Sequence, residues 1–265
     1  MKVGVFGASG MLGGYVLEFF KRKNYNVVEL KRDDVVTDEN ALSELLSKKI
    51  GSGWVINCVG VIKPQIAVQG SAEAIRVNGM FPHILANAGK KTAVNVLHIT
   101  TDCVFSGKTG GYTENSPHDE QDMYGRSKSI GEPTNCQVVR TSIIGEEKVH
   151  KRSLIEWAKG ERGKEVRGFT NHTWNGVTCL EFAKIAENII NAGPRWDGVR
   201  HVHSPRKVDK QELLTLISDA FSLNLKIAPF ETESPVFRDL SSIYPPAFDI
   251  PDLKEQLQEL VGFYS

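Results

Sequence analysis

Three glycines near the start of the chain limit most strongly what it can fold into. Gly7, Gly10 and Gly13 have the spacing G-x-x-G-x-x-G, directly after an apolar run over residues 3–6 that predicts a strand. A helical pattern over residues 11–21 begins inside this motif. Glycines there permit a tight turn and a close approach of the backbone to a pyrophosphate, which the N–H groups of the helix start then bind. The alternative is an ordinary strand-to-helix turn that needs glycine.

The motif predicts a dinucleotide site, and the end of the second strand indicates which dinucleotide. The predicted contacts in the loop are Gly7, Ser9, Gly10, Met11 and Leu12. A basic residue after the second strand accommodates the extra phosphate of NADP, and an acidic one binds the ribose hydroxyls of NAD. Arg32, with Lys31 beside it, favours NADPH, whereas Glu29 would favour NADH if the strand ended earlier. The alternative for Arg32 is a solvated surface charge.

Short apolar runs alternate with helical patterns along the first half of the chain. This alternation implies a parallel sheet with helices on both faces. The predicted fold class is therefore α/β, with a Rossmann-like, doubly wound parallel sheet. Strands are predicted over 3–6, 26–30, 54–59, 94–100 and 138–140, and helices over 11–21, 40–48, 72–88 and 124–132.

The second half is less regular and predicts a smaller, interleaved C-terminal lobe. Helices are predicted over 154–158, 179–191, 210–220 and 253–261, a strand over 199–202, and irregular chain over 230–251. We expect residues 1–145, with part of 165–205, to form an NAD(P)-binding domain. Residues 146–265 would then be mainly the substrate-binding lobe. The final helix would support a homodimer, although its amphipathic face is equally explained by packing on its own domain.

Composition narrows the classes of partner. The chain has 265 residues, with 32 basic and 32 acidic side chains, so it lacks the basic excess expected of a nucleic-acid binder. We see no signal-peptide pattern and no apolar run near the ~20 residues that span a bilayer. Four separated cysteines form no C-x-x-C pair. We therefore expect a cytoplasmic protein with isolated thiols, without a disulfide framework, metal site or membrane partner.

A tyrosine and a lysine are placed for proton transfer. Tyr124 and Lys128 are spaced i and i+4 on a predicted helix, so their side chains share one face. The lysine ammonium would lower the pKa of the tyrosine, which could then exchange a proton with a carbonyl oxygen as hydride arrives. Thr101 lies in a hydroxyl-bearing loop at the end of an earlier strand, where ligands bind in such sheets. The alternative for the pair is an ordinary surface helix.

With these motifs the chain resembles an extended short-chain dehydrogenase/reductase and, more narrowly, the dTDP-4-dehydrorhamnose reductase family. The resemblance covers roughly the first 145 residues, and it thins through about residue 205. The matching segments are 7–13, 55–60, 76–78, 100–107, 124–132 and 139–142.

The resemblance implies roles for particular residues. Thr101, Tyr124 and Lys128 would be the catalytic triad of a hydride transfer from NADPH to C4 of a nucleotide-activated 4-keto-6-deoxy sugar. Further cofactor contacts would come from Cys58, Val59, Gly60, Thr100, Tyr124 and Lys128. Substrate contacts are expected from Asp102, Cys103 and Arg140. Apart from the resemblance, Trp174 lies in a polar loop and is a candidate platform for a sugar or base; the alternative is a core position.

Cys103 departs from the family pattern, which usually has tyrosine there. Its setting resembles GDP-fucose synthase and the rhamnose-forming epimerase/reductases, in which a cysteine at this position moves protons on carbons beside the ketone. A thiol suits that task if its pKa falls toward neutrality. His150, Lys151 and His172 are candidates for the second acid/base. The alternative is that Cys103 is a small packing residue.

Other functions remain open on this scaffold. The C-terminal lobe matches the family only loosely, so neither the nucleotide nor the sugar follows from the sequence. One alternative is a sugar-nucleotide epimerase or dehydratase, although a dehydratase commonly has glutamate where Cys103 stands. Another alternative is a non-catalytic NADP-binding regulatory subunit, because fold alone does not settle function.

Overall fold

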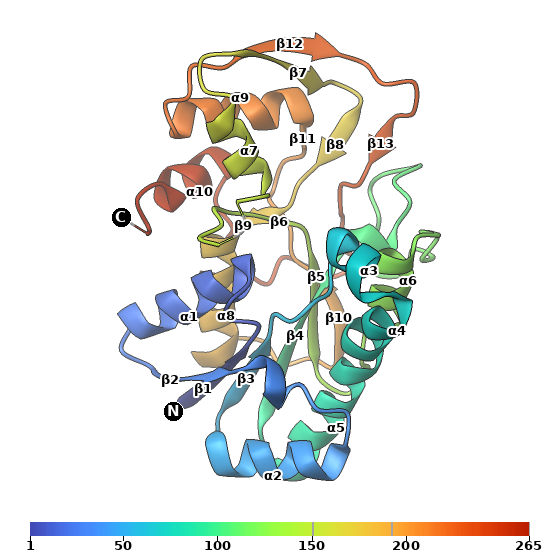
Figure 1. Cartoon of the computed structure of the whole chain (residues 1–265), viewed down its shortest axis with the longest axis vertical. Helices are drawn as coiled ribbons and strands as arrows, with labels where there is room; N and C mark the ends of the chain where they lie inside the picture. Colours follow the sequence, from blue (N-terminus) through green and yellow to red (C-terminus); the bar gives the residue numbers. More distant parts are fainter. Residues whose placement is uncertain (150, 192, 265) are drawn as a thin grey trace.

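A computed structural model of the protein describes residues 1–149, 151–191 and 193–264. Its centre is a six-stranded parallel sheet in the order β10-β5-β4-β3-β1-β2 (Figure 1). The strands are β1 (Lys2–Phe6), β2 (Asn26–Leu30), β3 (Trp54–Asn57), β4 (Asn95–Thr101), β5 (Gln137–Thr141) and β10 (Gly198–His201). The chain moves outward from β1 to β2 and then returns past β1 to β3. Ligands bind at such a reversal of strand order, beyond the carboxyl ends of the strands.

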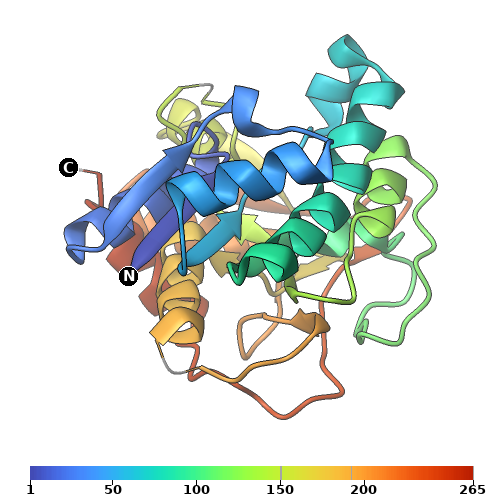
Figure 2. The ribbon, with the colours of Figure 1, turned by 90° about the horizontal axis from the view of Figure 1, so that it is seen from below.

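Helices cover both faces of this sheet. α1 (Met11–Arg22) and α8 (Cys179–Asn191) pack together on one face, and α2 (Glu39–Lys49) and α5 (Phe81–Thr92) on the other (Figure 2). Each face has its own apolar core, because the strands carry side chains alternately to the two sides. The predicted α/β class with a doubly wound parallel sheet is confirmed.

The long helix predicted over residues 72–88 is helical but not uniform. α3 (Lys63–Gln69) and α4 (Ser71–Ala74) precede a wider, π-helical turn over Ile75–Met80, and α5 then begins at Phe81. Pro82, in the first turn of α5, has no N–H to donate to the preceding turn, which favours a local change of helical pitch. The wide turn contains Asn78, a fully buried residue that reaches the candidate site.

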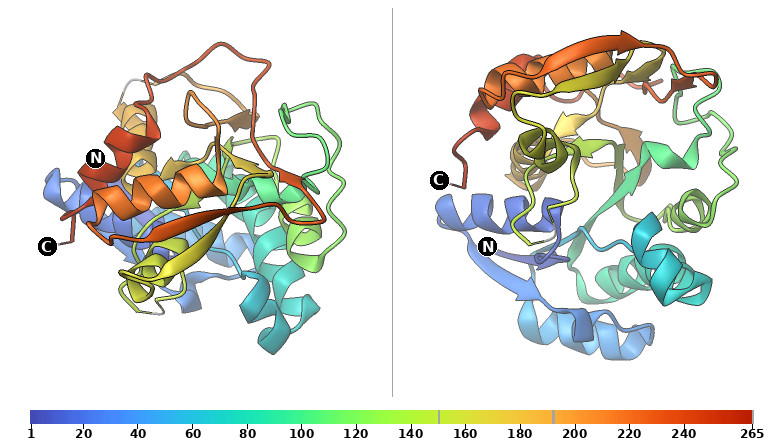
Figure 3. Two further views of the ribbon diagram at one scale, coloured as in Figure 1. Left: turned by 90° about the horizontal axis from the view of Figure 1, so that it is seen from above. Right: turned by 45° about the horizontal axis from the view of Figure 1, so that its top comes forward.

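The C-terminal lobe stands over the carboxyl ends of the central strands (Figure 3). Its small sheets join segments far apart in sequence. They comprise β8 (His172–Trp174) between β11 (Val208–Asp209) and β13 (Val236–Phe237), β7 (Glu165–Phe169) with β12 (Lys226–Phe230), and β6 (Ile143–Ile144) with β9 (Val177–Thr178). The lobe's helices are α7 (Leu154–Gly160), α9 (Lys210–Ala220) and α10 (Leu253–Leu260).

Part of the second half differs from the sequence analysis. The stretch expected to be irregular over 230–251 contains β13, because two residues gain a strand conformation from pairing with β8, which local patterns do not reveal. The apolar face of the final helix is covered within its own chain: Leu253, Leu257 and Leu260 are buried against the core. That face does not indicate a dimer. Within the described residues, no helix combines the length and apolarity needed to cross a bilayer.

Candidate active site

The glycine loop forms a tight seat between β1 and α1. Gly7 has φ of +77° and lies so close to β3 that a Cβ would come within 2.9 Å of the Cys58 carbonyl carbon. A Cβ on Gly13 would overlap the Gly7 carbonyl oxygen, so the first helical turn packs directly on the loop. Gly10 caps α1 without a side-chain acceptor. The first N–H groups of the helix therefore remain available to an anion.

Two buried side chains hold the segment after β3 beside this loop. The Asn57 amide oxygen accepts from the Val59 N–H at 3.2 Å. Asn78 accepts from the Val61 N–H at 2.8 Å, donates back to the Val61 carbonyl at 2.9 Å, and donates to the Ser127 hydroxyl at 3.0 Å. Asn78 thus ties this segment to α6 (Met123–Ile130), the helix that carries Tyr124 and Lys128. Cys58, Val59 and Gly60 accordingly lie between the glycine loop and the predicted catalytic helix.

The predicted triad lies where β4 ends. Thr101 is the last residue of β4, and its hydroxyl donates to Asp102 at 3.0 Å and accepts from the Cys103 N–H at 3.1 Å. Lys128 is 5% exposed, and its amino group donates to the Ile99 carbonyl of the same strand at 3.0 Å. Tyr124 lies one turn earlier on α6, where the Thr101 side chain acts on its pKa. The structure therefore brings Thr101, Tyr124 and Lys128 together.

Burial dominates the proton affinities of this group. It lowers the pKa of Lys128 to about 8 and raises the pKa of Tyr124 above its usual value. Cys103 raises the pKa of Tyr124 further, and Thr101 acts to lower it. We expected Lys128 to lower the tyrosine pKa, but burial dominates and the pKa is raised instead. The phenol is protonated at neutral pH.

Cys103 lies at the same site, and its thiol does not have the near-neutral pKa that proton exchange would require. Burial raises the pKa of Cys103 to about 12, the neighbouring Asp102 carboxylate adds to the rise, and Arg238 opposes it. The Arg238 guanidinium lies 3.4 Å from the Cys103 sulfur. The thiol is therefore neutral at neutral pH, beside a cation that favours its ionised form.

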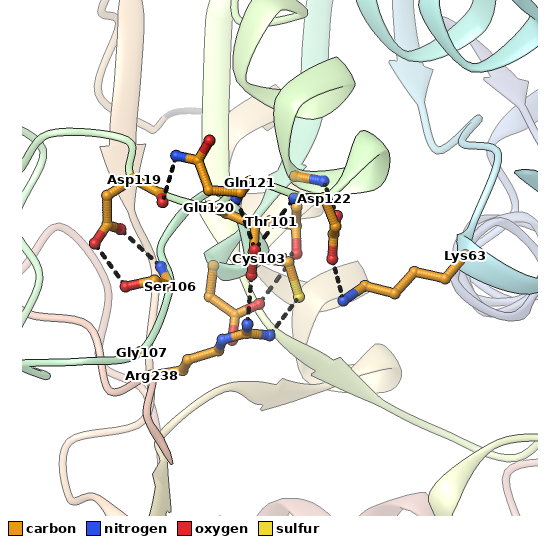
Figure 4. Close-up of polar contacts among 12 residues, drawn as sticks. Lys63, Thr101, Cys103, Ser106, Gly107, Asp119, Glu120, Gln121, Asp122 and Arg238 are labelled. Carbon is orange, nitrogen blue, oxygen red and sulfur yellow. Dashed lines mark hydrogen bonds and ion pairs between the residues drawn. The ribbon is translucent and has the colours of Figure 1, made fainter. Parts of the chain in front are cut away.

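The sequence analysis missed two cations of the C-terminal lobe. Arg238 follows β13 and reaches Cys103, with Glu120 as its ion-pair partner at 2.8 Å (Figure 4). Lys210 begins α9, and its charge acts on both Asp102 and Cys103. No local pattern marks either residue, since each reaches the site only through the packing of the lobe.

One further residue could have been identified from the sequence. Asp122 immediately precedes the helical pattern, as an N-cap residue does, and it accepts from the Gly125 N–H at 2.8 Å. It also pairs with Lys63 of α3 at 2.5 Å (Figure 4).

Two predicted substrate contacts are corrected. Arg140 is 1% exposed, and its guanidinium is engaged by Glu132 at 2.5 Å and by His118 and His201, each at 2.8 Å. A guanidinium satisfied in this way stabilises the fold and leaves no exposed donor for a substrate. Trp174 is 4% exposed and belongs to the apolar core under the lobe, so its ring offers no open platform.

The second acid/base candidates separate in the structure. His150 lies outside the described residues. Lys151 is exposed and has a left-handed backbone, with φ of 49°. His172 on β8 lies near Lys210 and Arg238, both of which help burial to lower its pKa. Its ring nitrogen Nε2 lies 2.8 Å from the Thr232 hydroxyl. Among the described candidates, only His172 is grouped with the two cations that face Cys103.

The residues around the seat fit a dinucleotide. The Thr100 hydroxyl is buried and has no hydrogen-bond partner in the part of the chain that the structure describes. Lys128 donates one of its three N–H groups to the Ile99 carbonyl, so the other two remain available to a ribose. Arg32 follows the end of β2 on a short turn and is 78% exposed, 3.9 Å from Glu73. Glu29 lies within β2, paired in register with Val5.

Comparisons with known proteins agree with this geometry. A family model described as the RmlD substrate binding domain matches residues 1–233. The chain is 32% identical, over 149 residues, to a dTDP-4-dehydrorhamnose reductase of Streptomyces griseus, which covers 53% of this chain and 49% of that protein. It thus spans about half the length of that relative.

A second relative covers more of the chain. The probable low-salt glycan biosynthesis reductase Agl14 of Haloferax volcanii is 30% identical over 228 residues, covering 77% of this chain and 75% of that protein. Among solved structures, the dTDP-4-dehydrorhamnose reductase of Bacillus anthracis in complex with NADP has a TM-score of 0.80 at 19% identity, over 98% of both chains. At that identity, the likeness shows the fold.

Proposed function

This chain belongs to the RmlD substrate binding domain family, and from that membership we propose that it is an NADPH-dependent reductase of the 4-keto group of a nucleotide-activated 4-keto-6-deoxy sugar. The observation that carries the proposal is the convergence of Thr101, Tyr124 and Lys128 at the end of β4, beside the glycine loop. Two relatives are named as reductases, one of them a dTDP-4-dehydrorhamnose reductase. The product would be a rhamnose-type sugar nucleotide.

In this proposal the glycine loop and the start of α1 hold the pyrophosphate of NADPH. Arg32 pairs with the 2′-phosphate, and Thr100 and Lys128 bind the nicotinamide half. Their unpartnered hydroxyl and remaining N–H groups support this assignment. Glu29 is less suited to a ribose, because it lies inside β2 rather than beyond its end. The bound cofactor supplies the hydride that reaches C4 of the sugar.

Tyr124 gives its phenolic proton to the sugar oxygen as C4 accepts the hydride. The phenol holds its proton at neutral pH, as a proton donor must when the substrate binds. The Thr101 hydroxyl orients the keto oxygen, and the Lys128 ammonium stabilises the phenolate left on Tyr124. Proton transfer to that phenolate from solvent restores the enzyme.

The C-terminal residues 146–265, with Asp102 and Cys103 opposite, would bind the sugar nucleotide. We propose that Cys103 also exchanges protons at the carbons beside the ketone, as a built-in 3,5-epimerase, with His172 as the second acid/base. The support is positional: Cys103 lies two residues after Thr101, and β8 carries His172 into the neighbourhood of Arg238.

The test is NADPH oxidation by the purified protein with 4-keto-6-deoxy sugars carrying UDP, dTDP or GDP. Each sugar is supplied with and without a separate 3,5-epimerase, to wild type, Cys103→Ser and His172→Asn. We expect turnover of one nucleotide series without added epimerase. That turnover should be lost in Cys103→Ser and restored by the added enzyme.

Other results separate the parts of the proposal. If wild type turns over only with added epimerase, the protein is a reductase without epimerase activity and Cys103 is a packing residue. Binding of NADPH without oxidation with any sugar would contradict the reductase and favour a regulatory subunit.

A further inference from the structure

The segment that follows β13 is fixed against the Cys103 loop by its backbone. Phe237 donates its N–H to the Gly107 carbonyl at 2.7 Å, and Arg238 donates its own to Thr173 at 3.1 Å. A Cβ on Gly107 would come within 2.8 Å of Val236 and 3.2 Å of Arg238, so only glycine lets the segment approach this closely. The starting point of the Arg238 side chain is therefore determined by two elements, one on each side.

The Arg238 side chain then lies between a sulfur and a carboxylate (Figure 4). Its Nη1 is 3.4 Å from the Cys103 sulfur, and its Nη2 donates to Glu120 Oε2 at 2.8 Å. Its Nε is buried and has no partner within the described residues. The Arg238 guanidinium thus contacts both the Cys103 sulfur and the Glu120 carboxylate, and its Nε remains available to donate a hydrogen bond.

Glu120 is itself held in place from behind. Its other carboxylate oxygen, Oε1, accepts from the N–H groups of Gln121 at 2.8 Å and Asp122 at 3.3 Å. Its own N–H donates to Val104, the residue after Cys103, at 3.2 Å. The carboxylate cannot swing away without breaking these bonds, so the distance between Arg238 and the sulfur depends on Glu120.

We infer that Arg238 is the positioning residue of Cys103: it fixes the sulfur and promotes its ionisation, and Glu120 limits that effect by drawing the guanidinium charge away. The inference rests on the proposed role of Cys103. A cation donating to a thiolate stabilises it, and a carboxylate on the same cation weakens that stabilisation. Other charged or titratable groups that act on the site are Asp102, Asp122, Tyr124, His172, Lys63 and Lys210.

Replacing Arg238 and replacing Glu120 should change the alkylation rate of Cys103 in opposite directions. This distinguishes an electrostatic effect on the thiol from a change in its accessibility. We would measure the rate of iodoacetamide alkylation of Cys103 in the full-length protein at one mildly alkaline pH, by mass spectrometry of its peptide. Only the thiolate reacts. We expect Arg238→Met to slow alkylation by roughly tenfold and Glu120→Gln to accelerate it by a few-fold. Arg238→Lys should retain part of the wild-type rate.

A matched control is Arg206→Met, which removes an arginine of the same lobe whose ion pairs with Glu212 and Asp252 lie on the surface. It should leave the rate unchanged. If Arg238→Met and Glu120→Gln change the rate in the same direction, or not at all, the pair is only structural and the inference is wrong. The assay needs neither cofactor nor sugar, so its outcome is independent of whether the protein proves to be a reductase.

Discussion

The amino group of Lys128 donates a hydrogen bond to the main-chain carbonyl of Ile99, 3.0 Å away and two residues before Thr101. This bond joins α6, the helix that carries Tyr124, to β4, the strand that ends at Thr101. It also keeps a charged group almost fully buried, since Lys128 is 5% exposed. The position suits the proposed chemistry and costs stability.

Replacing Lys128 should change stability in a pH-dependent way. Burial lowers its pKa from 10.5 to about 8, so the unfolded chain holds the proton more tightly than the folded one. The penalty is therefore full below pH 8, shrinks as pH rises toward 10.5, and is absent above it. We expect the gain in unfolding free energy of Lys128→Met over wild type to be larger at neutral pH than at pH 10.5, by up to about 3 kcal/mol.

Urea unfolding at the two pH values checks this. Lys164→Met, which removes a lysine whose side chain is 62% exposed, serves as the control and should show no such difference. An equal effect of Lys128→Met at both pH values would contradict the assignment of a buried ammonium.

Removing the tyrosine hydroxyl should separate binding from chemistry. Tyr124→Phe keeps the aromatic ring but loses the proton donor. We expect NADPH affinity, measured by fluorescence titration, to stay within about twofold, while kcat for sugar reduction falls by roughly 10²–10⁴-fold. Wild-type kcat in this variant would exclude Tyr124 as the acid.

The fold of the glycine loop should tolerate a methyl group at Gly10 and not at Gly13. In Gly13→Ala the new Cβ overlaps the Gly7 carbonyl oxygen, whereas in Gly10→Ala it lies 3.3 Å from that oxygen. We expect Gly13→Ala to lose about 1–3 kcal/mol of stability and at least about tenfold in NADPH affinity. Gly160→Ala on α7, with nothing within 4 Å of its Cβ, controls for the substitution itself. Thermal unfolding would show whether Gly13→Ala and Gly10→Ala are equally stable, which the geometry forbids; fluorescence titration measures the loss of NADPH affinity in Gly13→Ala.

The buried Arg140–Glu132 pair should be important for folding rather than for substrate binding. Its side chains are 2% and 7% exposed, and the two atoms lie 2.5 Å apart. Glu132→Gln leaves the guanidinium charge uncompensated in the core, and we expect a loss of about 3 kcal/mol in urea unfolding. Glu212→Gln breaks an exposed pair, with side chains 49% and 41% exposed, and should cost under about 1 kcal/mol. A raised KM for the sugar in Glu132→Gln, with stability unchanged, would reverse the assignment.

Arg32 tests the preference between the two dinucleotides. Its side chain is 78% exposed beyond the end of β2, so a substitution there should not disturb the fold. We expect Arg32→Ser to weaken NADPH relative to NADH by roughly tenfold in kcat/KM, since it removes the phosphate partner. Arg206→Ser, elsewhere on the surface, should leave the ratio unchanged. A constant ratio in Arg32→Ser would make Arg32 a solvated surface charge.

The sequence by itself was enough to predict the fold class and the glycine loop of the first half of the chain. The glycine spacing, the alternation of strands and helices, and the Tyr124/Lys128 pair are local patterns, and the family match over residues 1–233 agrees with them. Local patterns suffice there because a strand, a turn and a helix each follow from neighbouring residues. The direction of the Tyr124 and Cys103 pKa changes did not follow, because desolvation depends on what the whole fold places around a group.

The surroundings of the residues proposed to bind the substrate could be determined only from the tertiary structure. Cys103 and Arg238 are 135 residues apart, and the pairing of β13 with β8 brings them together. Arg140 and Trp174 are residue types that are common in ligand-binding sites, yet both are buried in the interior. The sequence specifies which side chains are present. The surroundings of each side chain depend on contacts between distant segments, and these contacts form only when the chain folds.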